Sequence, residues 1–451
     1  MSEVKVNKIS PRSGTEVTLG DSGDTFTIPS GATINNQGTA TNFGATGAAS
    51  WDTTVKTASF TGVAGVGYFV NTTSGAITVT LPASPAAGAV VAVSDYAGTA
   101  DTNNITIGRN GSNINGAAAD QIISIENSAV TLVYVDGTQG WKATDTSNLN
   151  DIELQPTYVT ATGGTITCCG DYKVHTFTGP GTFCVSAVGN PAGSTSVDYL
   201  VVAGGAGGSF GGGGAGGYRE SSGAASGCYA ASPLGACVSA LPVTTTGYPI
   251  TVGGGGAGRP SNANGSSSIF STITSNGGGT GGGASTNNGP GIAGGSGGGG
   301  GHGPGTPVNA QPSGAGNTPP TSPAQGTPGG TGYQSGGNFG GGGGGGATVA
   351  GTNAVGGSPT SNTGGNGGTG ATTSINGTPT TFAGGGGGAY YYNTCAGQAG
   401  AGGGGRSGIE GGGSDGATAG TTNTGGGGGG GNGTGKAGGS GIVIIRYKFQ
   451  N

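Results

Sequence analysis

Between residues 50 and 147, apolar and polar side chains alternate with the two-residue period of a β-strand. In AITVTL, for example, Ile77, Val79 and Leu81 fall on one face. The expected strands are KTASF, GYFVN, AITVTL, AVVAVSDY, NITIG, QIISI, AVTLVYV and GWKAT, with turn signals such as TTSG and SPAAG between them. The pattern predicts a small antiparallel β-sandwich. We expect Trp141 to pack at its edge; stacking on a sugar is the alternative.

A second set of strand-like runs flanks a long glycine-rich block. TYVTATGGTITCC, YKVHTFTG, GTFCVSAV and VDYLVVAGG lie within or just past residues 157–202, and SGIVIIRYKF lies near the C-terminus. We expect residues 157–202 and 440–451 to form one β-sheet base in which the first and last strands pair. His175 stands in the alternating run YKVHTF, so it is interpreted as a strand side chain and not as a catalytic one.

The block between these runs consists of glycine runs separated by aperiodic polar inserts. The purest runs include residues 211–217, 340–346 and 425–431, in a chain with 115 glycines among 451 residues. A flexible linker has this composition, but linkers seldom extend over hundreds of residues between two apolar strands. Glycine in extended helices with three residues per turn packs side by side and forms lateral hydrogen bonds. The prediction is an ordered polyglycine II lattice standing on the base.

Such a lattice is stable only if nearly all of its interior backbone groups are paired. Ordering the backbone costs about 1–2 kcal/mol per residue, and more for glycine, whereas one hydrogen bond returns roughly 0.5–1.5 kcal/mol. The runs lack the strict Gly-X-Y period of collagen. The fold expected for the chain is therefore all-β plus a glycine-rich lattice, with an arm or shaft at residues 1–49, the sandwich at 50–147, a linker at 148–156 and the glycine-rich domain at 157–451.

Charge and motif patterns argue against several function classes. Charged residues make up 7% of the chain and the net charge is -5, without a basic stripe, so we expect no nucleic-acid binding. GGNGTGKA, residues 430–437, matches half of a phosphate-binding loop, but Ala437 replaces the required Ser or Thr. The glycine block offers only Glu220, Glu410 and Asp415 as carboxylates, so we expect no catalytic pair. No cofactor, metal ion or membrane insertion is expected.

The chain has six cysteines, and their spacing lacks the paired CxxC units of a zinc site. Cys228 and Cys237 close the insert CYAASPLGAC, and a disulfide there is one prediction. Cys169 or its neighbour Cys168 would face Cys184 if their strands were adjacent, which gives a second candidate bridge. Free thiols are the alternative for both pairs. Cys395 has no close partner in sequence and is expected to be free.

Aromatic residues in the polar inserts are the candidate binding residues. Aromatic rings stack on sugars and apolar patches, and tyrosine adds a hydroxyl at small entropic cost. A lid over the flank of the lattice is the alternative role for each ring. The candidates are Tyr229, Tyr248, Tyr333, Phe339 and the triplet Tyr390, Tyr391 and Tyr392.

Glycine runs that alternate with variable loops resemble the tip adhesins of T-even-like bacteriophages, whose polyglycine II sandwich displays receptor-binding loops. VDYLVVAGGAGG, GGGGAGGYRE, YPITVGGGGAG and SGIVIIRY, together with the opening NKISPRSGTEVTLGDSGDTFTIPSG, are similar to tail-fibre proteins of marine and cyanobacterial phages. The resemblance implies a non-enzymatic, homotrimeric fibre that binds a host surface glycan or outer-membrane protein. It also implies attachment to other tail proteins through the N-terminus.

The resemblance further implies a virion component that is made in the host cytoplasm, and MSEVKVNKISPRSG has no apolar signal region. Two alternatives to receptor binding remain open. One is a structural subunit of an extracellular filament or sheath without a receptor. The other is a fibre-borne polysaccharide depolymerase.

Overall fold

The computed structural model describes residues 49–145 and 153–450, except 228, 284–288, 303–310, 336–337, 357–362, 392–394, 409–415 and 432, together with residues 9, 13–15, 17, 25 and 27. Most of the expected arm at residues 1–49 lies outside this set. The chain divides into two compact units, Met1–Glu153 and Leu154–Asn451, which are described separately. Apart from one 3-10 turn, η1 (Pro233–Gly235), the described regular elements are β-strands, so the all-β prediction is confirmed.

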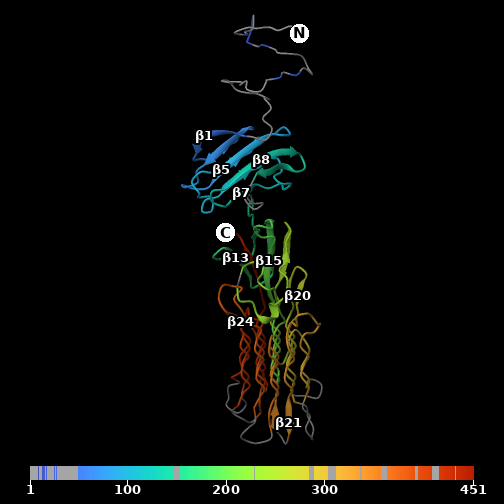
Figure 1. Cartoon of the computed structure of the whole chain (residues 1–451). Coiled ribbons are helices and arrows are strands. Elements are labelled where there is room, and N and C mark those ends of the chain that lie inside the picture. The colour runs from blue at the N-terminus through green and yellow to red at the C-terminus, as the bar shows by residue number, and fades with distance from the viewer. Residues whose placement is uncertain are drawn as a thin grey trace. The chain divides into compact units, whose positions relative to one another are not determined.

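The first unit contains two five-stranded sheets (Figure 1). One sheet has the spatial order β1 (Ser50–Lys56), β3 (Val66–Val70), β5 (Val90–Asp95), β8 (Ala129–Asp136) and β9 (Gly140–Asp145). The other has the order β10 (Glu153–Leu154), β7 (Gln121–Ile123), β6 (Ile105–Gly108), β4 (Ile77–Thr80) and β2 (Phe60–Thr61). From β1 to β6 the chain therefore alternates between the two sheets.

Because of this alternation, the chain winds as a coil from β1 to β6, and successive strands within each sheet are parallel. We call this arrangement the parallel coil. β1, β3 and β5 pair in parallel, and so do β2, β4 and β6. Only the later strands β7, β8 and β9 pair in antiparallel fashion with their neighbours. The antiparallel sandwich expected from the sequence is thus wrong for β1 to β6. A two-residue period shows which face a side chain occupies, but it is the same for both strand directions.

The two sheets enclose one apolar core. Ile77, Val79 and Leu81 are all buried in it, as their alternation predicts. Trp141 is fully buried in the same core, and its ring meets that of Tyr134 edge-on at a centroid distance of 5.6 Å. Both sequence-based expectations for Trp141, a place at the sandwich edge and stacking on a sugar, are therefore wrong. Its strand, β9, pairs along β8 and turns this side chain inward.

The second unit begins with a base of two further sheets. One has the order β11 (Thr160–Thr162), β14 (Gly181–Ala187), β18 (Gly247–Thr251), β19 (Ser268–Phe270) and β20 (Ile273–Ser275). The other has the order β12 (Thr165–Cys169), β13 (Tyr172–Phe177), β25 (Ile442–Lys448), β15 (Ser196–Val202) and β16 (Tyr218–Glu220), with β17 (Leu241–Pro242) beside β15. β25 pairs with β15, with Leu200 opposite Ile444, so the expected pairing of the two bracketing strands is confirmed.

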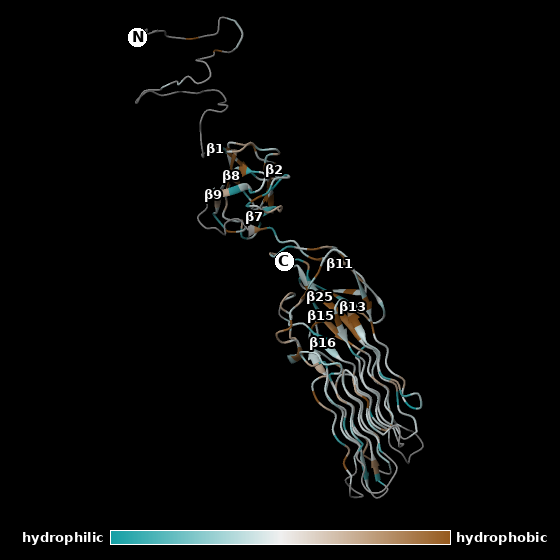
Figure 2. Ribbon diagram, turned by 90° about the vertical axis from the view of Figure 1, so that its right-hand side faces the viewer, coloured by the Kyte–Doolittle hydropathy of each residue, from teal (hydrophilic) through white to brown (hydrophobic). Residues whose placement is uncertain are grey.

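Apolar side chains between these sheets form the core of the base, which contains Phe183, Phe270 and Tyr447. In Figure 2 the hydrophobic residues of this unit concentrate in the strands of the base, whereas the glycine columns are pale. His175 is fully buried here. Its Nδ1 lies 2.7 Å from the Gly163 carbonyl oxygen, so Nδ1 carries the proton, and its Nε2 accepts from the Tyr447 hydroxyl at 3.0 Å. The interpretation of His175 as a strand side chain is confirmed.

The buried imidazole predicts a pH dependence of stability. Burial lowers the pKa of His175 below its usual 6.5. Below pH 6.5 the unfolded chain therefore binds more protons than the folded chain, and stability falls by at most about 1.4 kcal/mol per pH unit. His175→Gln retains one donor and one acceptor without titrating. We expect urea unfolding midpoints at pH 7.5 and 5.5 to differ more for the wild type than for this variant; equal differences would contradict the assignment.

Beyond the base, the chain runs back and forth as extended glycine columns (Figure 1). Their hydrogen bonds follow a three-residue period. In the run 211–217, the amides of residues 212 and 215 donate to the carbonyl oxygens of residues 342 and 345 in one neighbouring column. The amides of residues 213 and 216 donate to residues 428 and 425 in a second column, and the amides of residues 214 and 217 donate to residues 279 and 276 in a third. Successive residues therefore bond to different neighbouring columns, as a helix with three residues per turn requires. The polyglycine II prediction is confirmed.

The purest glycine runs are the innermost columns. The run 211–217 donates to three columns and accepts from three others, through the amides of Ala206, Gly299 and Gly386. Every residue of this run is buried, as is every residue of the runs 340–346, 383–389 and 425–431. A Cβ on such a residue meets a neighbouring backbone: at Gly428 it would lie 2.0 Å from the Lys436 carbonyl oxygen. The glycines of these runs therefore have no room for a side chain, and alanine occurs at only a few positions such as Ala215 and Ala383.

Candidate functional site

Aromatic rings gather where the innermost columns end. β21 (Tyr333–Ser335) and β22 (Asn338–Gly340) form a hairpin at the end of the lattice opposite the base (Figure 1). Phe339 immediately precedes the run 340–346, and Phe210 immediately precedes the run 211–217. We call this group the distal aromatic cluster. Its members are Phe210, His302, Tyr333, Phe339, Tyr390 and Tyr391.

His302 is the centre of the cluster. Its ring centroid lies 4.5 Å from that of Phe210, nearly perpendicular, and 4.5 Å from that of Phe339. The Tyr391 ring meets Phe339 edge-on at 5.6 Å, and the Tyr391 amide donates to the Phe339 carbonyl oxygen at 3.0 Å. Phe210 and His302 were missed by sequence reasoning. The signal for Phe210 was its position between two glycine runs.

Tyr390 anchors the cluster to the lattice. Its side chain is 1% exposed, and its ring lies against Gly340, where a Cβ would come within 2.9 Å of Cε2. Burial, and then the proximity of Tyr333, raises the pKa of Tyr390 to about 12. Its hydroxyl has no hydrogen-bond partner among the described residues. Tyr390 is therefore a packing side chain rather than an accessible one.

The other sequence-predicted members of the cluster remain accessible. Tyr333, Phe339 and Tyr391 are half-buried, and the Tyr333 ring lies flat on Gly356, where a Cβ would come within 2.0 Å of Cε1. Tyr392 lies outside the described residues. The cluster therefore covers the end of the columns and leaves part of the surface of three rings exposed.

Tyr229 and Tyr248 do not belong to this site. The Tyr248 ring lies 6.0 Å from Phe270 in the base. The Tyr229 ring faces the Arg446 guanidinium at 5.4 Å, and its hydroxyl donates to the Ser221 carbonyl oxygen. These two candidate binding residues therefore pack against the base, because their inserts fold back onto its sheets.

A buried carboxylate fixes one of these inserts. Glu220, 2% exposed, accepts hydrogen bonds from the Tyr218 hydroxyl at 2.7 Å, the Ser232 amide at 2.9 Å and the Thr373 hydroxyl. Burial raises its pKa. Because all three donors belong to this protein's own scaffold, Glu220 joins β16, the following insert and β23 (Ala371–Thr373). Its arrangement is that of a structural group.

The described cysteines are free thiols, so the predicted bridge between Cys169 and Cys184 is wrong and the free-thiol alternative holds for this pair. Cys169 lies in β12 and Cys184 in β14, which belong to different sheets. Cys237 is free, and its expected partner Cys228 lies outside the described residues. Cys395 is free and exposed, which confirms that prediction.

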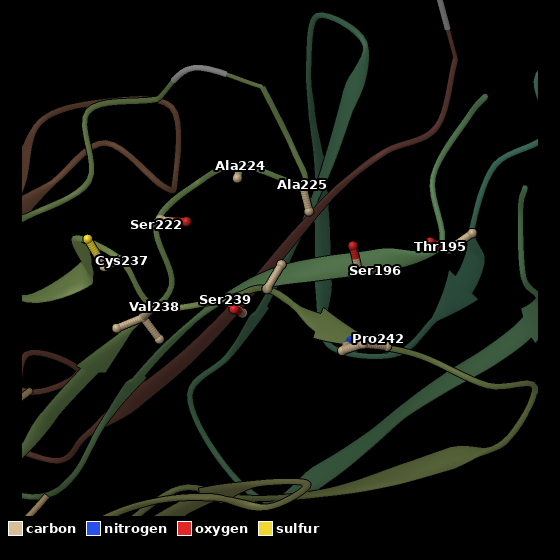
Figure 3. A pocket seen from close by; sticks show the side chains of 10 residues that line it. Thr195, Ser196, Ser222, Ala224, Ala225, Cys237, Val238, Ser239 and Pro242 are labelled. Carbon is tan, nitrogen blue, oxygen red and sulfur yellow. The ribbon is translucent and has the colours of Figure 1, made fainter. Parts of the chain in front are cut away.

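A pocket in the base offers little chemistry. It lies beside β15 and β17, and its lining residues are small or neutral (Figure 3). They are Thr195, Ser196, Ser222, Ala224, Ala225, Cys237, Val238, Ser239, Ala240 and Pro242. Across the described part of the chain, no group of three His, Cys, Asp or Glu side chains is arranged to hold a metal ion. Within that part there is also no helix long and apolar enough to cross a membrane.

A match to a known protein family lies within the second unit. A comparison with curated proteins finds no match. A family described as a glycine-rich domain matches residues 176–448, from β13 through every glycine column to the end of β25. This match covers the bracketing strands as well as the lattice between them, and it spans more than half of the chain. The chain therefore belongs to the glycine-rich domain family.

Proposed function

We propose that this protein is a phage tail-fibre protein that binds the host cell surface non-covalently through the distal aromatic cluster. The observation that carries the proposal is the half-buried rings of Tyr333, Phe339 and Tyr391 at one end of a lattice ordered by backbone hydrogen bonds. Aromatic side chains dominate binding surfaces because they bury much area with few rotatable bonds. A rigid scaffold reduces the entropy lost when they bind.

The receptor class we propose is a surface glycan or an outer-membrane protein loop, with weak individual contacts strengthened by several fibres on one virion. Homotrimer formation and attachment to other virion tail proteins through residues 1–49 are part of the same proposal. Sedimentation equilibrium of the full chain tests the trimer. A mass of one chain would contradict it.

Cell binding tests the receptor site. Fluorescently labelled protein is titrated onto a panel of bacterial strains, and the fraction of labelled cells is measured. We expect the double change Phe339→Ala and Tyr391→Ala to weaken binding by about tenfold or more, as aromatic anchors do at other interfaces. Tyr96→Ala is the matched control, because Tyr96 is 57% exposed in the first unit and outside the cluster.

Two results would contradict the proposal. One is binding that the double variant retains in full. The other is no binding to any strain together with open helical polymers in electron micrographs, which would favour a structural filament subunit. Shortening of a host polysaccharide during incubation would instead indicate a depolymerase.

A further inference from the structure

A groove of about 610 Å³ lies on the glycine-rich unit, and none of the residues that line it belongs to the distal aromatic cluster. This volume lies within the range of small-ligand sites, roughly 300–1,000 Å³. We call it the flank groove. The residues that line it include Asn353, Thr363, Asn366, Cys395, Gln398 and Arg406.

The helix period explains why side chains collect there. With three residues per turn, residues i and i+3 of a column share one side. Thr363 and Asn366 are such a pair in one outer column, and Cys395 and Gln398 are another in the adjacent column. The backbone between these columns is bonded, since the Gly367 amide donates to the Gln398 carbonyl oxygen at 2.9 Å. The groove therefore presents side chains at a regular spacing on two columns joined by a backbone hydrogen bond.

Two asparagines in the groove have fixed amide orientations. Oδ1 of Asn353 accepts from the Thr331 amide at 2.8 Å, and Oδ1 of Asn366 accepts from the Gln398 amide at 2.8 Å. A backbone N–H can only donate, so each side chain must keep its oxygen toward the lattice. The Nδ2 groups of both asparagines are left to donate, and neither has a hydrogen-bond partner among the described residues. Both asparagines are exposed and line the groove, which therefore presents amide donors.

Arg406 adds a fixed positive charge. Its backbone amide donates to the Thr418 hydroxyl at 2.8 Å, and Nη2 donates to the Gly416 carbonyl oxygen at 3.3 Å. The side chain is exposed, and further guanidinium N–H groups are left over. Among the described residues that line the groove, none is acidic. The flank groove is therefore a local surface of hydrogen-bond donors and positive charge in a chain whose net charge is -5.

We propose that the flank groove binds a saccharide that carries a carboxylate. Arg406 pairs with the carboxylate, whose planar shape matches the guanidinium, and the Nδ2 groups of Asn353 and Asn366 donate to sugar oxygens. None of the described residues that line the groove is aromatic, so among them an apolar or nucleobase ligand has no stacking partner. The inference rests on the proposed function and deepens it, because it assigns an acidic glycan as part of the receptor.

Isothermal titration calorimetry on the full chain tests the groove without cells. The probes are oligogalacturonate, oligoguluronate and sialyllactose, with maltotriose as the neutral control. We expect at least one acidic probe to bind and maltotriose to bind at least about tenfold more weakly. Binding of no acidic probe, or binding of maltotriose with equal affinity, would overturn the proposal.

Matched variants place the ligand. Asn366→Asp retains an acceptor for the Gln398 amide but replaces the donor with a negative charge, and Arg406→Gln removes the positive charge. Each is expected to weaken binding of the acidic probe by about tenfold or more. Arg219→Gln makes the same charge change in β16 of the base and should leave the affinity unchanged. If both groove variants bind like the wild type while keeping its melting temperature, the assignment is wrong.

The outcomes separate this inference from the proposed function. The wild-type protein could bind an acidic probe, lose that binding in Arg406→Gln, and yet label no cells. That result would overturn the proposed cell attachment and leave the inference about the groove intact. Cell binding that depends on Phe339 and Tyr391, without binding of any acidic probe, would overturn the groove alone.

Discussion

Gly428→Ala is expected to destabilise the glycine-rich unit severely, whereas Gly254→Ala is expected to be tolerated. At Gly428 a Cβ would lie 2.0 Å from the Lys436 carbonyl oxygen and 2.7 Å from that of Ala437. Moving these columns apart breaks the bonds between them, from the Lys436 amide to Gly429 and from the Gly439 amide to Gly426. Buried amides and carbonyls that lose partners cost about 1–3 kcal/mol each, so we expect a loss of roughly 3 kcal/mol or more.

Gly254 is the matched control, because a Cβ there has no atom within 4 Å. It lies in an outer column, and Ala257, three residues further on, is exposed on the same side. Replacing this glycine lowers the entropy of the unfolded chain, which stabilises by about 0.4–1 kcal/mol where the backbone permits alanine.

Differential scanning calorimetry of the two variants measures the contrast. For a unit of this size, 1 kcal/mol corresponds to roughly 2–4 °C in Tm, so Gly428→Ala should melt about 6–12 °C below the wild type. Gly428→Val, with a larger side chain, should melt lower still. Equal Tm values for Gly428→Ala and Gly254→Ala would show that the interior columns do not require glycine.

Trp141→Ala is expected to destabilise the first unit and to leave the second unchanged. Trp141 is fully buried among the apolar side chains of both sheets. Truncating a buried tryptophan leaves a cavity and costs about 3–5 kcal/mol. Because the two compact units have separate cores, the loss should be confined to one unfolding transition.

Limited proteolysis at increasing temperature, followed by mass spectrometry, distinguishes the units. Cleavage within residues 49–145 should begin at a lower temperature in Trp141→Ala than in the wild type, and cleavage within residues 160–448 should be unaltered. Trp51→Ala is the control, since Trp51 is 43% exposed and its loss leaves no interior cavity. Equal sensitivity of the two tryptophan variants would contradict the core position of Trp141.

Local rules in the sequence anticipated much of the fold. The alternation of Ile77, Val79 and Leu81 correctly predicts their buried face, since that depends only on the two-residue period of a strand. The apolar runs around β15 and β25 predict the closure of the second unit. The uninterrupted run 425–431 predicts an interior column, because a side chain there would collide with neighbouring backbone whichever columns surround it.

The candidate site was predictable only in part. The aromatic character of Tyr333, Phe339 and Tyr391 was visible in the inserts, and the structure brings these residues to one end of the lattice. Tyr248 occupies an equally polar insert but packs in the base. The sequence does not show at which end of the lattice an insert lies, because the chain reverses direction at both ends of each column.

Local patterns along the chain are enough to predict its elements: alternating strands, glycine columns that require backbone pairing, and a base closed by the strands that bracket the glycine block. These follow from side-chain size and period, which are local properties. Three features become visible only in the folded chain: the parallel pairing of β1 to β6, the separation of Cys169 from Cys184, and the contacts of His302 with Phe210 and Phe339. These features depend on which distant segments become neighbours. Because glycine columns are joined by backbone hydrogen bonds, no side chain in the sequence identifies the column with which a given column pairs.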